Sequence, residues 1–161
     1  MKQEKFTPSS SLVATIGNLF RGRIHVFRKD VGKVFRIPDS QKYTVFRHLI
    51  VDSANNQLET NRAVFRVRFK LANMSPGFNK LFSWFPIPFF IGLPGFEEKY
   101  WLVNELEGYF QGIYQWASKE YAEKYATSWP MKFMTKRAVP GSISHEIISH
   151  TTLSEYLETT N

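Results

Sequence analysis

The sequence predicts an α+β fold of the ferredoxin-like type, in which the order βαββαβ forms a four-stranded antiparallel sheet. Three observations support this prediction. Residues 63–71 alternate strictly between apolar and polar side chains, which is the period of a strand with one buried face. Residues 75–85 and 118–129 repeat apolar side chains at helical spacing. Three further segments between turn-forming residues have the character of strands: 98–104, 109–116 and 142–148.

The first predicted strand has two unlike faces. One face is entirely apolar and consists of Ala63, Phe65, Val67, Phe69 and Leu71. The other face carries Val64 and the cations Arg66, Arg68 and Lys70. Inside a barrel, Arg66 and Arg68 would bind an anionic or quinone-type ligand. The alternative, a face at the solvent or at a dimer rim, is favoured because buried charges without partners are costly.

The first helix is predicted to begin at Ser75 and Pro76, because proline is tolerated in the first turn, and to end at Pro86. Its apolar face consists of Phe78, Leu81, Phe82 and Phe85. The following residues, up to Phe96, are very apolar for a loop. We expect this loop to lie in a subunit interface or over a hydrophobic pocket, with Phe90 as a ligand contact.

The second and third strands are predicted to form a hairpin, with Gly108 in its turn. On the third strand, Phe110, Tyr114 and Trp116 share a face with Gly112, which leaves space beside the rings. This face either binds a ligand, with Tyr114 as a hydrogen-bond donor, or packs on the two helices.

The second helix is predicted to begin after Ser118 and to end near Pro130. Residues 61–150 therefore form the ferredoxin-like domain. Residues 1–60 form a basic N-terminal extension, with a disordered tail over 1–11, a short helix over 12–20 and a strand over 43–51. Residues 151–161 form a polar and loosely held tail, in which three side chains are able to dock: Leu153, Tyr156 and Leu157.

Composition and charge exclude several classes of protein. With 43% hydrophobic and 16% aromatic residues, the chain is not generally disordered. The absence of cysteine excludes disulfides, thiolate metal sites and cysteine nucleophiles. The net charge is +7, and residues 20–47 hold eight basic residues against Asp30 and Asp39. This segment is interpreted as a solvated strip; the alternative is contact with anionic lipid or nucleic acid.

No segment resembles a signal peptide or reaches the roughly 20 apolar residues that span a bilayer. We therefore expect a cytoplasmic protein. Peripheral contact with an anionic membrane surface, through the amphipathic residues 12–27, is the alternative.

Five sequence stretches resemble the dimeric α+β barrel superfamily, and within it the YdhR-type and antibiotic-biosynthesis monooxygenase-like proteins. They are FRVRFKL, FPIPFFIGLPGF, KYWLVNELEGYFQGIYQW, SKEYAEKYA and RAVPGSISHEI, within residues 62–148. The resemblance implies a homodimer in which two sheets form a barrel around a hydrophobic, often aromatic, small molecule. It also implies oxidation without a metal or flavin. Haem degradation is disfavoured, because no histidine lies in the two predicted helices.

The candidate catalytic residues are Tyr114 and His145, the latter as a general base near neutral pH. A structural role for His145 is the favoured alternative. The candidate substrate-binding residues are Trp101, Trp116, Phe110, Arg66, Arg68 and Phe90. No metal site and no cofactor are expected, because the four histidines are scattered along the chain: His25, His48, His145 and His150.

The predicted function is the binding, and cofactor-independent oxidation, of a hydrophobic or aromatic small molecule by a homodimer. The alternative is a non-enzymatic module that binds membrane or RNA through the basic N-terminal segment and the aromatic sheet face. Nucleic acid is not an expected partner, because the third strand lacks the basic residue before glycine that RNA-recognition modules carry.

Overall fold

A computed structural model of the chain describes residues 6–37, 41–52 and 61–159. The helices are α1 (Pro8–Phe20), α2 (Pro76–Phe82), α3 (Ile87–Phe90), α4 (Lys119–Ala126), α5 (Trp129–Thr135) and α6 (Leu153–Glu158). The strands are β1 (Ile24–Val26), β2 (Val34–Ile37), β3 (Gln41–Val51), β4 (Ala63–Lys70), β5 (Phe96–Asn104), β6 (Tyr109–Trp116) and β7 (Ser144–Ser149).

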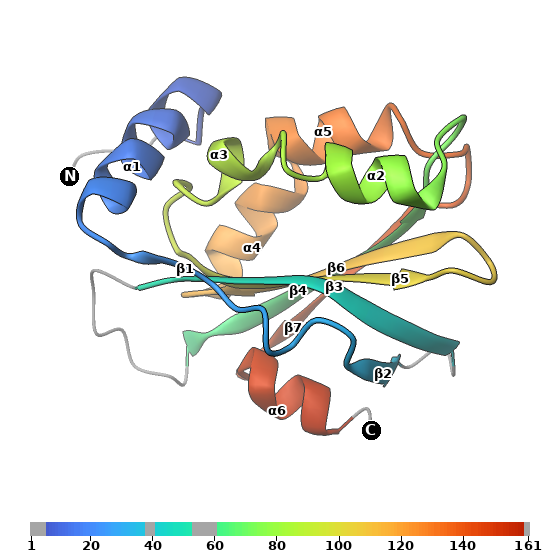
Figure 1. Cartoon of the computed structure of the whole chain (residues 1–161). Helices are drawn as coiled ribbons and strands as arrows, with labels where there is room; N and C mark the ends of the chain where they lie inside the picture. Colours follow the sequence, from blue (N-terminus) through green and yellow to red (C-terminus); the bar gives the residue numbers. More distant parts are fainter. Residues whose placement is uncertain (1–5, 38–40, 53–60, 160–161) are drawn as a thin grey trace.

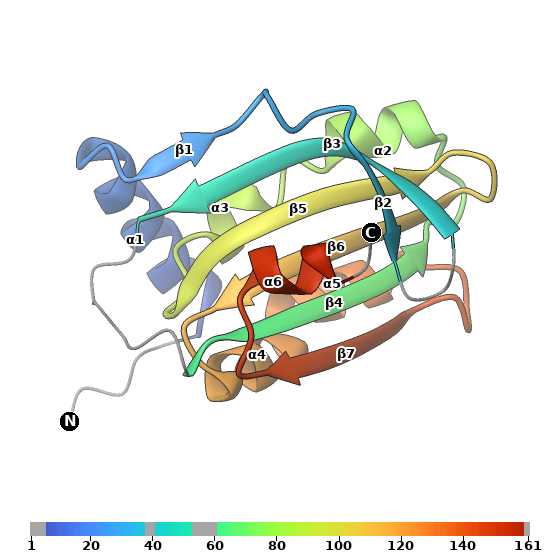
Figure 2. The ribbon, with the colours of Figure 1, turned by 90° about the horizontal axis from the view of Figure 1, so that it is seen from below.

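The strands form one antiparallel sheet in the order β1-β3-β5-β6-β4-β7, and β2 also pairs with β3 (Figure 2). Strands β5, β6, β4 and β7 are the four that the sequence predicted, and they lie in the ferredoxin-like order. The expected sheet of four strands is too small, because the predicted strand over 43–51 pairs with the free edge of β5 as β3. Strands β1 and β2 then follow one another along the outer edge of β3.

The sheet separates two layers of unlike size (Figure 1). Helices α1 to α5 lie over one face, and α6 lies alone under the other. The alternation of β4 is confirmed, because Phe65 and Val67 belong to the core under the five helices, whereas Val64 belongs to the core against α6. The side under the five helices is called the helix face below, and the opposite side is called the α6 face.

The N-terminal helix begins earlier than the sequence predicted. Thr7 is its N-cap, and Thr7 Oγ1 accepts a hydrogen bond from the backbone N–H of Ser10 at 3.3 Å. Ser10 returns the interaction, and Pro8 occupies the first turn, where no intrahelical N–H is needed. The prediction of a disordered tail is therefore wrong for residues 8–11, while residues 1–5 lie outside the described part of the chain.

The predicted second helix consists of two helices. Helix α4 ends at Ala126, and Pro130 lies in the first turn of α5 instead of ending the preceding helix. A proline is equally suited to the first turn of a helix, so the residue marks a boundary without showing on which side the helix lies.

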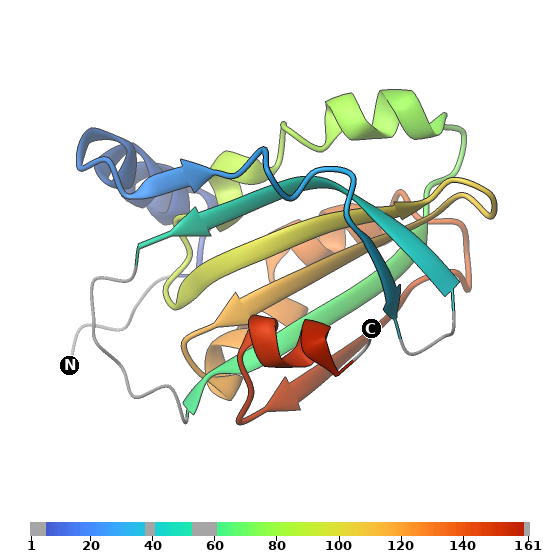
Figure 3. The ribbon, with the colours of Figure 1, turned by 60° about the horizontal axis from the view of Figure 1, so that its bottom comes forward.

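The C-terminal residues are ordered by capping and burial. Thr152 and Glu155 form a capping box at the start of α6, and the backbone N–H of Leu153 donates to Gln115 Oε1 at 2.7 Å. Three apolar side chains of α6 are buried against the sheet: Leu153, Tyr156 and Leu157. The prediction that these three side chains dock is confirmed. The prediction of a loosely held tail is wrong for residues 153–158. Figure 3 shows α6 crossing beneath β6 and β4.

The chain's own α6 packs on the sheet face opposite the five helices. The homodimer stays a prediction. Among the described residues, no helix is long and apolar enough to cross a membrane.

Candidate functional site

A partly open cavity of about 80 Å³ lies on the helix face, between the sheet and the pair α2 and α5. Its wall is almost entirely apolar and includes seven aromatic side chains besides tyrosines: Phe46, Phe69, Phe82, Phe90, Trp101, Phe110 and Phe133. Lysine, arginine and tyrosine groups also line it: Lys99, Tyr114, Tyr125 and Arg137. A volume of this order holds several water molecules or a small organic group.

Lys99 lies in the middle of β5 and is buried, with 5% of its surface exposed. Its Nζ donates a hydrogen bond to Tyr114 Oη at 2.6 Å. The same Nζ lies 4.1 to 4.3 Å from the ring centres of Phe90, Trp101 and Tyr114. The electron-rich faces of these rings offset part of the free-energy cost of burying an ammonium group.

Lys99 has no carboxylate within ion-pair distance among the described residues. Burial lowers the pKa of Lys99 well below its usual range, and the nearby positive charge of Arg47 lowers it further. A lysine with a lowered pKa gives up its proton at a lower pH than an exposed lysine does. Lys99 can therefore act as a general base.

Two tyrosines support this lysine. Tyr125 Oη donates to Tyr114 Oη at 2.9 Å, and both side chains are buried. Burial raises the pKa of Tyr114 above its ordinary value, although the hydrogen bond with Tyr125 acts in the opposite direction. Burial also raises the pKa of Tyr125. Both groups stay phenols near neutral pH, and Tyr114, which accepts hydrogen bonds from Lys99 and Tyr125, keeps its own O–H to donate to an oxygen atom in the cavity.

Gly112 makes the contact between Lys99 and Tyr114 sterically possible. A Cβ atom at position 112 would lie 2.7 Å from Tyr114 Cε2 and 3.3 Å from Lys99 Cε. The space beside Gly112 that the sequence predicted is thus filled by the Tyr114 ring. The ring leans along its own strand over Gly112, and Lys99 is the residue that pairs with Tyr114 on the neighbouring strand β5.

A β-bulge brings a second cation to the helix face. The register of β3 against β5 shifts between Val45 and Arg47, so that Phe46 and Arg47 both turn toward the helices. The Arg47 guanidinium lies 3.8 Å from the ring centre of Trp84. Burial lowers the pKa of Arg47 to about 10, so it remains a cation near neutral pH.

Arg47 also fastens the end of α2. Its Nη1 donates to Ser83 Oγ at 2.7 Å, and its Nη2 donates to the carbonyl oxygen of Lys80 at 3.1 Å. These acceptors lie at the C-terminal end of α2, where backbone carbonyls lack partners within the helix. Ser83 also lines the cavity, so Arg47 holds the part of the chain that covers it.

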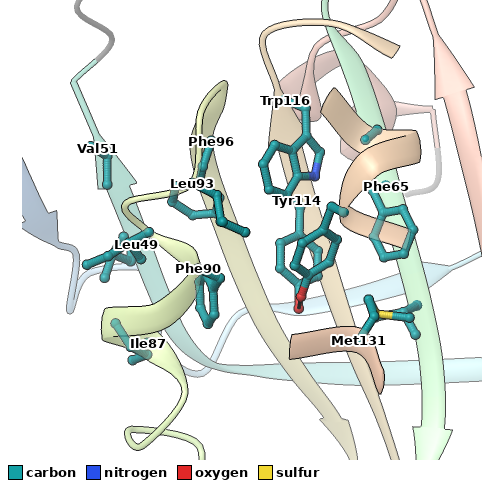
Figure 4. Close-up of a cluster of buried hydrophobic side chains, with 14 of the residues drawn as sticks. Leu49, Val51, Phe65, Ile87, Phe90, Leu93, Phe96, Tyr114, Trp116 and Met131 are labelled. Carbon is teal, nitrogen blue, oxygen red and sulfur yellow. Dashed lines mark hydrogen bonds between the residues drawn. The ribbon is translucent and has the colours of Figure 1, made fainter. Parts of the chain in front are cut away.

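The structure brings four of the sequence-predicted site residues together at the cavity: Tyr114, Trp101, Phe110 and Phe90. Trp116 is on the same face of β6, but it is buried between other rings, with Tyr125 at 4.9 Å and Phe96 at 5.6 Å between ring centres. Figure 4 shows Tyr114 and Trp116 side by side between Phe90 and Phe65.

The other predicted residues lie elsewhere. His145 is exposed on the edge strand β7, where it stacks on Phe65 with ring centres 5.4 Å apart. Arg66 and Arg68 are on the α6 face, so the sheet separates them from the cavity. Arg66 pairs with Glu146 at 2.7 Å, and Arg68 donates to Tyr43 Oη at 3.1 Å. No metal-type group of three or more ligating side chains occurs within the described residues.

Sequence reasoning missed Lys99, Arg47 and Tyr125. One signal pointed to Lys99, because it shares a strand face with Trp101 and Val103 and is an isolated cation on an otherwise apolar face. Arg47 carried no such signal, since only the bulge in β3 decides which face it joins.

No protein-family model and no curated protein matches the sequence. Two solved structures are similar in fold. One is an uncharacterised ferredoxin-fold protein related to antibiotic-biosynthesis monooxygenases from Listeria monocytogenes 4b F2365. It is 13% identical, with a TM-score of 0.51 over 71% of this chain and 67% of that one. The other is a monooxygenase-like protein from Listeria innocua, 12% identical, with a TM-score of 0.50 over 72% of this chain and 68% of that one.

Identities of this size establish the fold alone. The chain has a ferredoxin-like α+β fold, and the similarity to antibiotic-biosynthesis monooxygenase-like proteins that the sequence predicted is confirmed at that level. The chemistry of the site has to be argued from its own residues.

Proposed function

We propose that the protein binds a small hydrophobic molecule in the cavity on the helix face and removes a proton from it. The molecule would carry a phenolic hydroxyl or a methylene group activated by a carbonyl. The observation that carries the proposal is the buried Lys99, which has a lowered pKa and an aromatic surround, and which no described carboxylate neutralises. An apolar cavity with a few converging polar groups is typical of a small-molecule site.

The amine of Lys99 would accept the proton, and the substrate would become an anion. The positive charges of the protonated Lys99 and of Arg47 would stabilise that anion in surroundings where water screens little. Tyr114, held by Tyr125, would donate a hydrogen bond to the anionic oxygen. These roles need one buried base and one phenol, and both are present on adjacent strands.

The proposed oxidation uses dioxygen as the co-reactant. An activated CH₂ group loses a proton to Lys99, and the carbanion forms a C–O bond with dioxygen. The proton on Lys99 passes to the distal oxygen, which gives a hydroperoxide. Loss of water then leaves a carbonyl, so that CH₂ and O₂ become C=O and H₂O. The electrons come from the substrate carbon, in agreement with the expected oxidation without a bound cofactor.

The homodimer belongs to the same proposal. A dimer would place two such cavities in one particle.

Binding can be tested with 4-nitrophenol, because its phenolate absorbs visible light and its neutral form does not. At a slightly acidic pH, where most of the free probe is neutral, the protein should convert bound probe to phenolate. Lys99→Met should remove this conversion. Lys119→Met is the matched control, since Lys119 is an exposed lysine of α4 outside the cavity. Unchanged phenolate formation in Lys99→Met, or the absence of binding by the wild-type protein, would reject the proposed site.

Oxidation can be tested separately with 2-indanone, a small arene-fused ketone with activated methylene groups. We expect oxygen uptake by the wild-type protein, and a decrease of about 100-fold or more in Lys99→Met, the usual effect of removing a general base. Probe binding without oxygen uptake would leave a ligand-binding protein and reject the oxidation.

A further inference from the structure

Helix α1 carries its large apolar side chains on the outside of the molecule. Phe20 is 87% exposed, Val13 71% and Leu19 66%. With Leu12 and Ile16, which are also exposed, these residues form one continuous arc of the helix. An amphipathic helix of a soluble domain normally turns such an arc to the core, so the orientation requires a reason.

The orientation is fixed by the small and polar side of α1. Ser11 and Thr15 are the buried residues of the helix. Thr15 Oγ1 donates to the carbonyl oxygen of Pro88 at 2.7 Å, and a Cβ atom at Gly92 would lie only 2.0 Å from the carbonyl oxygen of Ser11. The backbone of α1 therefore lies directly against Gly92 after α3, and the opposite, apolar arc has to face outward.

Helix α2 and the residues directly after it have the same character. Leu81 is 67% exposed, Phe78 56% and Phe85 54%, and Trp84 beside them is half exposed. The rings of Phe82 and Phe85 continue this ridge onto Phe133 of α5, with ring centres 6.4 and 6.2 Å apart. Helices α1, α2, α3 and α5 lie in the same layer above the sheet (Figure 1). The exposed sides of α1 and of α2 in this layer are therefore both rich in apolar side chains.

The charge of this layer has one sign. Helices α1, α2, α3 and α5 contain no aspartate or glutamate. Basic residues lie within them or directly after them: Arg21, Arg23, Lys80, Lys132, Lys136 and Arg137. Within the described residues, Lys80 is the one of these six that pairs with a carboxylate, that of Glu105. The surface is thus apolar and cationic together.

We propose that the outer side of the helix layer docks on an anionic lipid bilayer. Exposed aliphatic and aromatic side chains would enter the headgroup and acyl boundary, and the basic residues would contact anionic headgroups. A second copy of the chain fits less well, because pairing through the same surface would bring two cationic layers together. Single-stranded nucleic acid has rings to stack on, such as Phe20 and Phe78, but it would leave the aliphatic part of the surface in water: Leu12, Val13, Ile16, Leu19 and Leu81.

The docking surface adjoins the cavity. Phe82 on α2, Phe133 on α5 and Arg137 directly after α5 line the cavity, and each of them is half-buried or exposed. A bilayer on this side would give a hydrophobic ligand a route from lipid to Lys99 without crossing water. This last step rests on the proposed function, whereas bilayer docking itself depends only on the surface.

Docking can be measured by flotation of the full chain with phosphatidylcholine vesicles, with and without phosphatidylglycerol, in the absence of any cavity ligand. The wild-type protein should float with anionic vesicles and much less with neutral ones. The double variant Leu19→Ser/Phe20→Ser should reduce the partition coefficient about tenfold or more. Arg21→Glu/Arg23→Glu should reduce it at least as much, and high salt should have a similar effect.

Matched controls use exposed residues away from the helix layer. Leu106→Ser removes a fully exposed leucine from the β5–β6 turn, and Lys42→Glu reverses an exposed charge on β3; both should bind as the wild-type protein does. All substituted side chains are exposed or half-buried, and circular dichroism would verify that each variant is folded.

Three results would overturn the proposal: no flotation of the wild-type protein, equal loss in the controls, or a dimer in solution that Leu19→Ser/Phe20→Ser dissociates. Displacement of the vesicles by single-stranded RNA at low concentration would assign the surface to nucleic acid instead. Because no cavity ligand is used, these outcomes are independent of the chemistry proposed for Lys99.

Discussion

The two faces of the sheet each bury an ionisable side chain, but within the described residues only on the α6 face does that side chain contact carboxylates. On the α6 face, His48 is buried between two carboxylates, with Nδ1 2.7 Å from Asp30 Oδ2 and Nε2 2.8 Å from Glu98 Oε1. On the helix face, Lys99 is equally buried, but its neighbours are rings and a phenol. Both sites lie on the same strand pair, since His48 is on β3 and both Glu98 and Lys99 are on β5.

The difference separates a structural role from a chemical one. The charges of the α6 face are compensated inside the chain, which fixes the loop that contains Asp30 against β3. On the helix face, no described carboxylate compensates the charge that Lys99 carries when it is protonated. Perturbed groups in clefts are candidates for function for this reason, and each of the following predictions tests one side of the comparison.

The largest effect is expected on the α6 face. His48→Leu would leave the Asp30 and Glu98 carboxylates without the group that bridges them, and Asp30 is 3% exposed. We expect the free energy of unfolding to fall by about 3–5 kcal/mol, as when one partner of a buried ion pair is removed. Urea denaturation would measure the loss. A loss below about 1 kcal/mol would show that this cluster is not structural.

On the helix face, removing the buried ionisable side chain is expected to increase the free energy of unfolding. Lys99→Met replaces a buried amine, whose ammonium form has no described carboxylate partner, by an apolar chain of similar length. The free energy of unfolding at neutral pH should therefore rise by about 1–3 kcal/mol, while phenolate formation is lost. Destabilisation would mean that Lys99 is held in place for the fold, as His48 is, and the contrast between the faces would fail.

Gly112→Ala tests the geometry that joins Lys99 to Tyr114. The new methyl group would collide with the Tyr114 ring and with the Lys99 stem. We expect a loss of about 1–3 kcal/mol from overpacking, together with weaker conversion of 4-nitrophenol to phenolate. Gly77→Ala is the control, because a Cβ atom there meets nothing within 4 Å.

The smallest effect concerns pH. Burial acts to raise the pKa of Asp30, but hydrogen bonds from Lys33 and His48 outweigh it, and the pKa lies below the ordinary value of 3.8. A carboxyl with a lowered pKa in the folded state stabilises that state above its unfolded pKa. The contribution is lost as the pH falls through the folded pKa. Denaturation midpoints between about pH 5 and pH 3 should fall less steeply in Asp30→Asn than in the wild-type protein.

The local patterns of the sequence were sufficient for much of the sheet. The strict alternation of β4 and the Gly108 turn predicted the strands and the faces of their side chains correctly, because a strand with one basic and one apolar face has a single favourable orientation. The boundaries near Pro8 and Pro130 were wrong, since capping side chains decided where α1 begins and proline suits the first turn of α5.

The site depends on contacts between strands that local patterns do not record. Phe110 and Tyr114 were candidates because they share a strand face with Gly112, Phe90 because it lies in an apolar loop, and Trp101 as a further aromatic residue of a predicted strand. Lys99 becomes significant only when β5 pairs with β6 and places it opposite Tyr114. The outward arc of α1 was hidden for the same reason, because its close approach to Gly92 is a tertiary contact.

The most direct test of the account is an NMR titration of Lys99, with lysine labelled at Cε and the signal assigned by its absence in Lys99→Met. The account predicts a pKa well below 10.5 in the free protein, and an increase when 4-nitrophenol binds, because a bound phenolate favours the ammonium form. A Lys99 that titrates near 10.5 and does not respond to the probe would contradict it.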